Sequence, residues 1–241
     1  MPKPWLIAHR GASGTAPENT MAAFRRAIEL GANFIETDLQ LTRDAHLVAI
    51  HDVTLERTTN GRGTVRDYTL AELRQLDAGT WFSPEFAGEK IPTMDEIFGL
   101  AREADVVFFL ELKADVLWGV EHTLVHALRQ SGEAARTMVL SFHDRILANV
   151  HRLDPTLMTG FLFDKSLDNA VGLALRAGAR QVAPRADLVN RELVQTAHQE
   201  DLRVVTWAVN EPDQMRALIS TGVDGIMTDY PDRLRDVLAS M

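Results

Sequence analysis

The sequence predicts an α/β fold, a closed (β/α)8 barrel that carries an insertion after its second strand. Short apolar runs typical of strands alternate with amphipathic helical patterns along most of the chain, as in a parallel sheet whose strands are connected by helices. With 241 residues, 46% of them hydrophobic, the chain is long enough for one such barrel, typically ~250 residues, or for two smaller domains. The number of strands favours the single barrel.

Nine segments are predicted to be strands because each is a short run rich in apolar and β-branched residues. They are residues 5–9, 34–41, 47–51, 106–112, 138–142, 159–163, 181–183, 203–208 and 225–228. Helical periodicity covers residues 17–30, 93–103, 119–130, 144–153, 168–177, 190–200, 211–221 and 231–239. Several of these helices are expected to end at a glycine, which easily adopts the left-handed conformation found there.

The segment 47–51 cannot be a ninth barrel strand. Only residues 43–46 separate Thr42, directly after the preceding strand, from Leu47, whereas a parallel crossover needs roughly a dozen residues or more. We therefore expect 47–51 to return antiparallel, as the hairpin partner of an extension of strand 34–41. Eight barrel strands remain, and the hairpin brings His51 back to the rim of the barrel.

Residues 52–92 depart from the alternation of strands and helices. They contain a glycine-rich segment, one short helical pattern at 69–77 and an aromatic segment at 81–86. So long a stretch with little regular structure is uncommon in a compact domain unless it forms a functional lobe or lid. The expectation is a single domain, residues 1–241, with an insertion lobe at about 52–92 that covers the mouth of the barrel.

Composition excludes several classes of partner and chemistry. The formal net charge of −9 argues against nucleic acid or an anionic membrane as the main partner, because both bind basic patches. The absence of cysteine excludes disulfides, thiolate nucleophiles and zinc–thiolate sites, and is compatible with the cytoplasm. The apolar run before His9 is too short for a signal peptide or a membrane span. Nothing in the composition indicates an oligomeric state.

Glu36 and Asp38 are predicted to form a carboxylate pair. They stand two residues apart in one strand, so their side chains project to the same face. Glu111, at the C-terminal end of the next barrel strand, is expected to bring a third carboxylate to the same rim. Such acids repel one another and are costly to desolvate unless a cation or a proton joins them. Three oxygen donors without cysteine favour one divalent cation, Mg²⁺ or Ca²⁺, over zinc.

Arg10 and Lys113 stand beside these residues in the sequence. Lys113 should point with Glu111 into the mouth, where its ammonium can neutralise a phosphate oxygen. Arg10 should point away from His9 if the first strand continues through it. For either residue the alternative is a salt bridge to Glu36 or Glu111. Arg or Lys that filled the space between the acids, or acids too far apart to share a cation, would refute the metal site.

His9 and His51 are candidates for proton transfer. His9 closes the first strand and His51 closes the returning hairpin, so both should reach the mouth from different sides. Imidazole titrates near neutrality, which suits a proton donor to a leaving alkoxide and an acceptor from an attacking hydroxyl. The remaining histidines are expected to be structural or exposed, except that His143, just after a strand, allows either interpretation.

Phe142 and Trp207 lie at strand ends, where most core residues of a barrel are aliphatic. They either pack against the carbon atoms of a small polyol or fill the core or the lid. The segment 17–20, Pro-Glu-Asn-Thr, is predicted to begin a helix because it has proline early and an acid in the first turn. A role of Glu18 in orienting a histidine is the alternative.

Several motifs in order give the chain a family resemblance. They are His-Arg-Gly-Ala from His9 with Pro-Glu-Asn-Thr from Pro17, Glu-Thr-Asp-Leu-Gln-Leu-Thr from Glu36, His-Asp-Val-Thr-Leu-Glu-Arg-Thr-Thr-Asn-Gly-Arg-Gly from His51, Glu-Leu-Lys from Glu111 and Thr-Trp-Ala-Val-Asn from Thr206. Over its whole length the chain resembles the glycerophosphodiester phosphodiesterases, most of all the small cytoplasmic bacterial members. The resemblance implies a TIM barrel with a family insertion, His9 and His51 as an acid/base pair, Glu36, Asp38 and Glu111 as metal ligands, and Lys113 as a phosphate contact.

The reaction implied by this resemblance is hydrolysis of a glycerophosphodiester to sn-glycerol 3-phosphate and an alcohol. The metal neutralises the phosphoryl oxygens and polarises the nucleophile, one histidine removes a proton, and the other protonates the leaving oxygen. Either histidine can be the base. Either water attacks directly, or the glycerol hydroxyl attacks first and forms a cyclic phosphate.

Two other functions compete with this one. A lysophospholipase D or a sphingomyelinase-D-like phosphodiesterase on the same barrel is expected to have an exported precursor and an apolar mouth for a lipid tail, and the sequence indicates neither. A binding protein that keeps the barrel without the chemistry is disfavoured, because every proposed catalytic position carries a competent residue.

Overall fold

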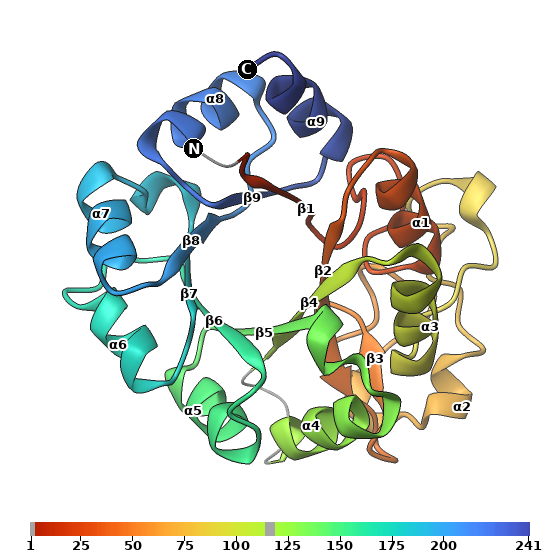
Figure 1. Ribbon diagram of the computed structural model, residues 1–241. Helices are drawn as coiled ribbons and strands as arrows, with labels where there is room; N and C mark the ends of the chain where they lie inside the picture. The colour runs from red at the N-terminus through yellow and green to blue at the C-terminus, as the bar shows by residue number, and fades with distance from the viewer. Residues whose placement is uncertain (1–2, 114–118) are drawn as a thin grey trace.

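Eight parallel strands closed into a barrel form the centre of the computed structural model, which describes residues 3–113 and 119–241 (Figure 1). Neighbours pair in sequence order, and the first strand also pairs with the last, which closes the ring. The predicted (β/α)8 barrel is thereby confirmed. Its strands are β1 (Trp5–Ala8), β2 (Phe34–Leu41), β4 (Val107–Leu112), β5 (Thr137–Ser141), β6 (Met158–Phe163), β7 (Gln181–Pro184), β8 (Arg203–Thr206) and β9 (Gly225–Thr228).

Helices surround the barrel on the outside (Figure 1). They fall within or close to the predicted helical segments, and several end at a glycine in the left-handed conformation, such as Gly132 and Gly222. Within the described ranges there is no helix long and apolar enough to cross a membrane. The helices are α1 (Met21–Glu29), α3 (Met94–Ala104), α4 (Val120–Ser131), α5 (Asp144–Leu153), α6 (Ala170–Arg176), α7 (Arg191–Gln199), α8 (Pro212–Thr221) and α9 (Pro231–Ala239).

The first helix begins later than the sequence predicts. The pattern places its start at residue 17, whereas α1 begins at Met21, after Thr20, whose side chain accepts a hydrogen bond from Ala23 N. Asn19 has a φ of 55°, a left-handed conformation that cannot continue a right-handed helix. The prediction of a helix from residue 17 is therefore wrong, and Pro-Glu-Asn is a turn before the helix.

The hairpin that removes one strand from the barrel count is present. β3 (Leu47–Ala49) runs antiparallel to β2, and Leu39 pairs with Ala49. The strand is shorter than the predicted 47–51, but Ile50 N still donates a hydrogen bond to Asp38 O at 3.0 Å. His51 therefore follows directly after the point where the returning chain passes Asp38.

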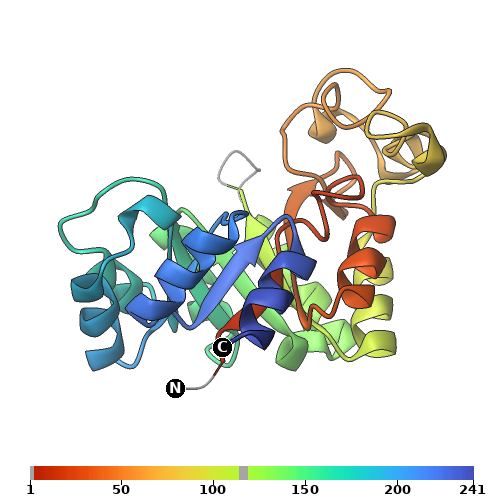
Figure 2. The same cartoon turned by 90° about the horizontal axis from the view of Figure 1, so that it is seen from above.

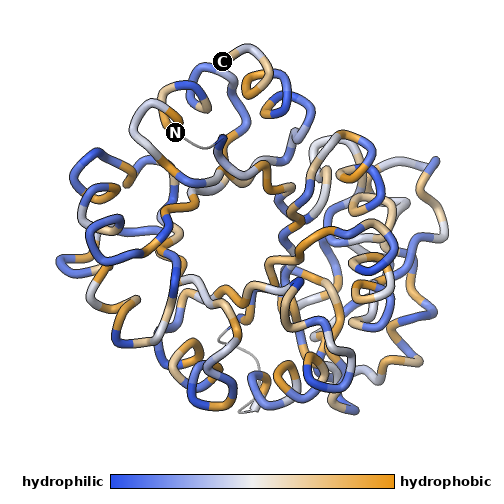
Figure 3. The backbone as a smooth tube through the Cα atoms, in the orientation of Figure 1, coloured by the Kyte–Doolittle hydropathy of each residue, from blue (hydrophilic) through white to orange (hydrophobic). Residues whose placement is uncertain are grey.

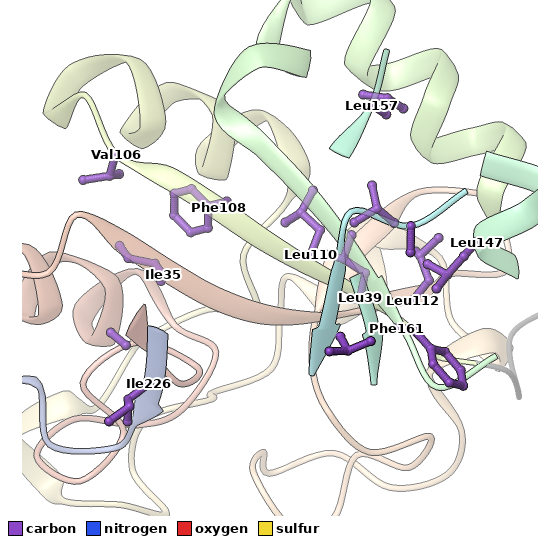
Figure 4. Close-up of a cluster of buried hydrophobic side chains, with 14 of the residues drawn as sticks. Ile35, Leu39, Val106, Phe108, Leu110, Leu112, Leu147, Leu157, Phe161 and Ile226 are labelled. Atoms are coloured by element: carbon purple, nitrogen blue, oxygen red, sulfur yellow. The ribbon is translucent and has the colours of Figure 1, made fainter. Parts of the chain in front are cut away.

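Alternate residues of the barrel strands serve two separate hydrophobic clusters. Outward-facing side chains such as Ile35, Phe108 and Leu110 pack between the strands and the helices (Figure 4). Inward-facing side chains such as Phe109 and Leu162 fill the barrel. Hydrophobic residues accordingly follow the ring of strands in Figure 3, with hydrophilic residues around the periphery. Because the two sets alternate, the residues that follow the inward-facing apolar layer along each strand point into the barrel mouth.

Residues 52–92 rise above one side of the barrel, on the side of β2 and β3 (Figures 1 and 2). Their regular structure is limited to η1 (Val65–Asp67), α2 (Leu70–Leu73), which is shorter than the predicted 69–77, and η2 (Pro84–Phe86). Side chains of this segment, of β3 and of Ile50 form a small hydrophobic cluster of their own. It comprises Val48, Ile50, Leu55, Val65, Leu73, Ala78 and Ile91.

The turn after β1 leaves no room for a side chain at Gly11. Its φ is +82°, and an added Cβ would lie 2.6 Å from the carbonyl carbon of Ala23 in α1. We expect Gly11→Ala to lower the free energy of unfolding by at least about 2 kcal/mol, because left-handed strain and overlap with backbone act together. Urea unfolding measures the change.

Gly88→Ala is the matched control for this variant. Gly88 has a φ of +95°, but an added Cβ would meet nothing within 4 Å. This variant should therefore show only the cost of the left-handed backbone. Equal losses in the two variants would contradict the steric argument.

Candidate active site

Three carboxylates meet at the C-terminal end of the barrel. Glu36 and Asp38 project from β2 to the same side, and Glu111 is the direct partner of Asp38 in the neighbouring strand β4. One oxygen from each of the three lies within 4.8 Å of those of the other two, and all three residues are buried. The convergence follows from strand alternation and register, as the sequence analysis expects.

Two basic side chains enter the same cluster. Lys113 Nζ lies 2.7 Å from Asp38 Oδ1 and 2.6 Å from Glu111 Oε1, and Arg10 Nε lies 3.2 Å from Asp38 Oδ2. Glu36 Oε2 accepts a hydrogen bond from the backbone N–H of Arg10 at 2.9 Å. A basic residue that filled the space between all three acids would refute a cation site, and Lys113 does stand between two of them, Asp38 and Glu111.

The acids nevertheless fit a divalent cation. They carry three carboxylates against the charges of Lys113 and Arg10, and Arg10 is shared with Glu18, 2.8 Å away. Their donors are all carboxylate oxygens, the ligands that Mg²⁺ and Ca²⁺ prefer. Lysine is a flexible point charge without a rigid fork, so its ammonium can give way to an ion between Asp38 and Glu111.

Burial and mutual repulsion drive the pKa values of the three acids apart. Burial, together with Asp38 and Glu111, raises the pKa of Glu36 well above its ordinary value. Burial and Asp38 likewise raise the pKa of Glu111 to about 7. Burial acts on Asp38 in the same direction, but Lys113 and Arg10 hold the pKa of this carboxyl well below its usual range. Both upward shifts favour the protonated form of Glu36 and Glu111, and a divalent cation can replace those protons.

Arg10 lies inside the site, contrary to the direction expected for a continuing strand. β1 ends at Ala8, and Arg10 has a φ of 56°, so the alternation of strand side chains stops before it. Its side chain turns toward Asp38 and Glu18 because the strand does not extend to this position. Burial disfavours its charge, but these acids raise the pKa of Arg10 above its ordinary value.

His9 and His51 each have an aspartate at Nδ1. His9 Nδ1 lies 2.7 Å from Asp229 Oδ1, and His51 Nδ1 lies 2.6 Å from Asp52 Oδ1. A carboxylate at Nδ1 holds the ring in place and leaves Nε2 for other partners. His9 Nε2 lies 4.0 Å from Glu36 Oε2. Both histidines are therefore oriented for exchange of a proton at Nε2.

The two aspartates are themselves held by hydrogen bonds. Asp229, directly after β9, accepts from Ser13 Oγ at 2.9 Å and from Asn210 Nδ2 at 2.6 Å. Burial alone would raise the pKa of Asp229, but hydrogen bonds, first of all that to His9, lower it to about 2. The pKa of Asp52 also falls to about 2, mainly through its hydrogen bond to Arg57. Both partners of the histidines are thus ionised at neutral pH.

Asn19 supports the carboxylates from the turn before α1. Its Nδ2 donates to Asp38 Oδ2 at 2.8 Å, and its Oδ1 accepts from Thr37 Oγ1 at 2.7 Å. Glu18, one residue earlier, pairs with Arg10 and Arg57 and not with a histidine. The segment 17–20, predicted to begin a helix, is therefore part of the site.

Four polar residues of the site have no assigned role in the sequence analysis: Asn19, Asp52, Arg57 and Asp229. Three of them lie inside the motifs quoted there, and Asp229 follows a predicted barrel strand. Glu111 is predicted as a site residue because it lies at the C-terminal end of a barrel strand. The same reasoning applies to Asp229, so the sequence could have identified that residue too.

One cavity, with a volume of about 60 Å³, is lined by all of the predicted site residues except Asp38. Charged residues from the ends of β1 to β4 line it together with apolar residues from the other strands. The ring centroids of Phe142 and Trp207 are 5.5 Å apart at 87°, and Trp207 Nε1 donates to Ala183 O at 2.8 Å. The lining residues are His9, Arg10, Glu36, His51, Glu111, Lys113, Leu140, Phe142, Leu162, Trp207 and Met227.

Known proteins are similar to this chain in sequence and in fold. A family model described as the glycerophosphoryl diester phosphodiesterase family matches residues 9–233. A glycerophosphodiester phosphodiesterase of Caldanaerobacter subterraneus subsp. tengcongensis is 42% identical over 234 residues, 96% of each chain. One from Bacillus subtilis is 34% identical over 251 residues, 96% of this chain and 85% of the other. Among solved structures, an Oleispira antarctica phosphodiesterase in complex with the product sn-glycerol-3-phosphate has a TM-score of 0.90 at 28% identity and covers 98% of this chain and 97% of its own.

Proposed function

The chain belongs to the glycerophosphoryl diester phosphodiesterase family, and on that premise we propose that the carboxylate cluster and the two histidines form its catalytic centre. The enzyme hydrolyses a glycerophosphodiester to sn-glycerol 3-phosphate and an alcohol. The observation that carries the proposal is the cavity in which His9 and His51 line the same space as Glu36 and Glu111. Proton transfer and charge neutralisation can then act on one bound phosphate.

Glu36, Asp38 and Glu111 are proposed to hold one divalent cation, Mg²⁺ or Ca²⁺. Their close approach and burial support this, as do the raised pKa values of Glu36 and Glu111, since a cation relieves the repulsion among the acids. When bound, such an ion neutralises charge on the phosphoryl oxygens and polarises the nucleophile. Arg10 and Lys113 add positive charge at the same end of the cavity, where they can contact phosphate oxygens.

His9 and His51 are proposed to transfer the protons. The Nε2 of one ring accepts the proton of the attacking hydroxyl, and the Nε2 of the other, protonated beforehand, donates a proton to the leaving oxygen. Asp229 and Asp52 at Nδ1 fix the tautomer and stabilise the imidazolium that forms. After the reaction the base is protonated and the acid is neutral, so the base must lose its proton to solvent and the acid must regain one before the next turnover.

The apolar side of the cavity is proposed to take the carbon atoms of the substrate. Phe142 and Trp207 form a perpendicular pair beside Leu140 and Leu162. Such a surface suits the glycerol carbons, while the charged side holds the phosphate.

We also propose that residues 1–241 act as one TIM-barrel domain, with 52–92 as its insertion lobe.

The experiment that tests this function is release of sn-glycerol 3-phosphate from glycerophosphocholine, with and without a chelator. We expect activity to be lost in EDTA and restored by excess Mg²⁺ or Ca²⁺, because the carboxylate cluster then regains its cation. Full activity after exhaustive chelation would refute the metal site. It would leave Lys113, between Asp38 and Glu111, as the resident counter-ion.

A further inference from the structure

Arg57 connects the lobe to the catalytic site through two carboxylates. Its Nε and Nη2 donate to Asp52 Oδ2 and Oδ1 at 2.6 and 3.0 Å. Its Nη1 and Nη2 donate to Glu18 Oε2 and Oε1, both at 2.8 Å. The guanidinium thus forms two bidentate pairs, one with an acid at the start of the lobe and one with an acid of the turn before α1.

Each of these acids contacts a different residue of the proposed catalytic centre. Asp52 Oδ1 lies 2.6 Å from His51 Nδ1, and Glu18 Oε1 accepts from Arg10 Nη1 at 2.8 Å. Arg10 in turn lies 3.2 Å from Asp38. One guanidinium therefore stands behind a proton-transfer residue and a phosphate-site residue at the same time.

The donors of Arg57 are almost fully used by this arrangement. An arginine has five N–H groups, and four hydrogen bonds to Asp52 and Glu18 occupy four of them. At most one donor is left for a substrate oxygen. Arg57 is thus poorly suited to bind phosphate itself, in contrast to Arg10.

We propose that Arg57 is a positioning residue, which orients His51 through Asp52 and Arg10 through Glu18. The inference rests on the proposed function, because that function assigns the roles of His51 and Arg10. Without the fork, Asp52 and Glu18 lose their shared partner and repel each other, and both rotate more freely. A displacement of about 1 Å at a catalytic group can cost on the order of 10²-fold in rate. The lobe therefore contributes to catalysis through Arg57.

Arg57→Ala and Arg57→Lys test the proposal, with Arg74→Ala as the matched control. Arg74 is also a lobe arginine, and its guanidinium binds a helix of the barrel: its Nη1 and Nη2 donate to Glu96 at 2.9 and 2.8 Å. Its hydrogen-bond partners, Glu96 and Ile91 O, lie outside the site. We expect Arg57→Ala to lower kcat/KM by roughly 10- to 100-fold, the usual cost of removing a group behind a ligand or catalytic residue. Arg57→Lys should lower kcat/KM nearly as much as Arg57→Ala, because an ammonium cannot form two bidentate pairs. Arg74→Ala should stay within about threefold of wild type.

Two further measurements separate positioning from a merely structural role. Added guanidinium ion should restore part of the activity of Arg57→Ala and none of any loss in Arg74→Ala. In a cycle with Glu18→Gln, the double variant should lose less than the product of the single losses, because both changes break the same link. A structural role would produce neither effect.

The outcomes distinguish this inference from the proposed function. Arg57→Ala within threefold of wild type, an equal loss in Arg74→Ala, or multiplicative losses in the cycle would overturn the positioning role. If Arg57→Ala does not fold, Arg57→Lys replaces it in the comparison with wild type, in the comparison with Arg74→Ala and in the cycle with Glu18→Gln. If the wild type releases no sn-glycerol 3-phosphate, the proposed function fails; a shift of the His51 ¹⁵Nδ1 resonance in Arg57→Lys then still supports the positioning, and an unchanged resonance refutes it.

Discussion

His9→Ala and His51→Ala should each lower turnover of glycerophosphocholine at least roughly 10²-fold, because a positioned acid or base typically contributes 10²- to 10⁴-fold. The fold and the affinity for the cation should be nearly unchanged. Each histidine binds its own aspartate at Nδ1. In the proposed centre the two rings transfer protons, whereas the three carboxylates hold the ion. Steady-state kinetics at saturating metal, with circular dichroism as the check on folding, measures the effect.

His143→Ala is the control for these variants. His143 also follows a barrel strand, at the start of α5, but it is exposed and lies outside the cavity lining. His143→Ala should leave turnover unchanged.

The double variant His9→Ala/His51→Ala should lower turnover by about the product of the two single losses if the two rings act independently, and by much less if they act as one unit. Near-wild-type turnover by either single variant would return that histidine to a structural role.

Glu36→Gln should weaken binding of the divalent cation by at least roughly 10²-fold, more than the 10- to 100-fold typical of a residue behind a ligand. The amide removes a negative charge and one carboxylate oxygen from the cluster. The free energy of unfolding should not fall, because burial and the neighbouring acids already raise the pKa of Glu36 and oppose its charge. Isothermal titration calorimetry with Mg²⁺ and Ca²⁺ measures the affinity, and urea unfolding measures the stability.

The same titration should depend on pH in a defined direction. The pKa of Glu111 lies at about 7, and a carboxylate must lose its proton to bind the ion. Affinity should therefore rise as the pH increases from about 6 to about 8. Glu121→Gln is the control, since Glu121 is a buried acid of α4 bonded to Asn149 outside the site. A loss of affinity in this control, or none in Glu36→Gln, would contradict the assignment of the ligands.

Strand alternation and linker length account for what sequence reasoning predicted correctly. The two-residue spacing of Glu36 and Asp38 requires a shared face, whatever else the chain does. The four-residue connection before Leu47 excludes a parallel strand, so the hairpin and the barrel count follow. These are constraints between near neighbours in the chain, which covalent geometry imposes before any tertiary contact forms.

Local rules failed where a residue departs from regular backbone. Asn19 and Arg10 both have left-handed φ values, so the helix begins at Met21 and Arg10 turns into the site. Asparagine adopts the left-handed region more readily than most residues, but nothing local marks Arg10. A long-range contact stabilises each conformation: Asn19 bonds Asp38, and the backbone of Arg10 bonds Glu36.

By itself, the sequence determined the barrel, the returning hairpin and the identity of the acids and histidines that meet at its mouth. Only the tertiary structure decided how these groups are held. Asp229 reaches His9 across 220 positions of the chain, and Arg57 reaches Glu18 across 39. Periodicity reports which face of an element is buried, whereas the partner of a buried charge depends on which distant elements the closed barrel brings together.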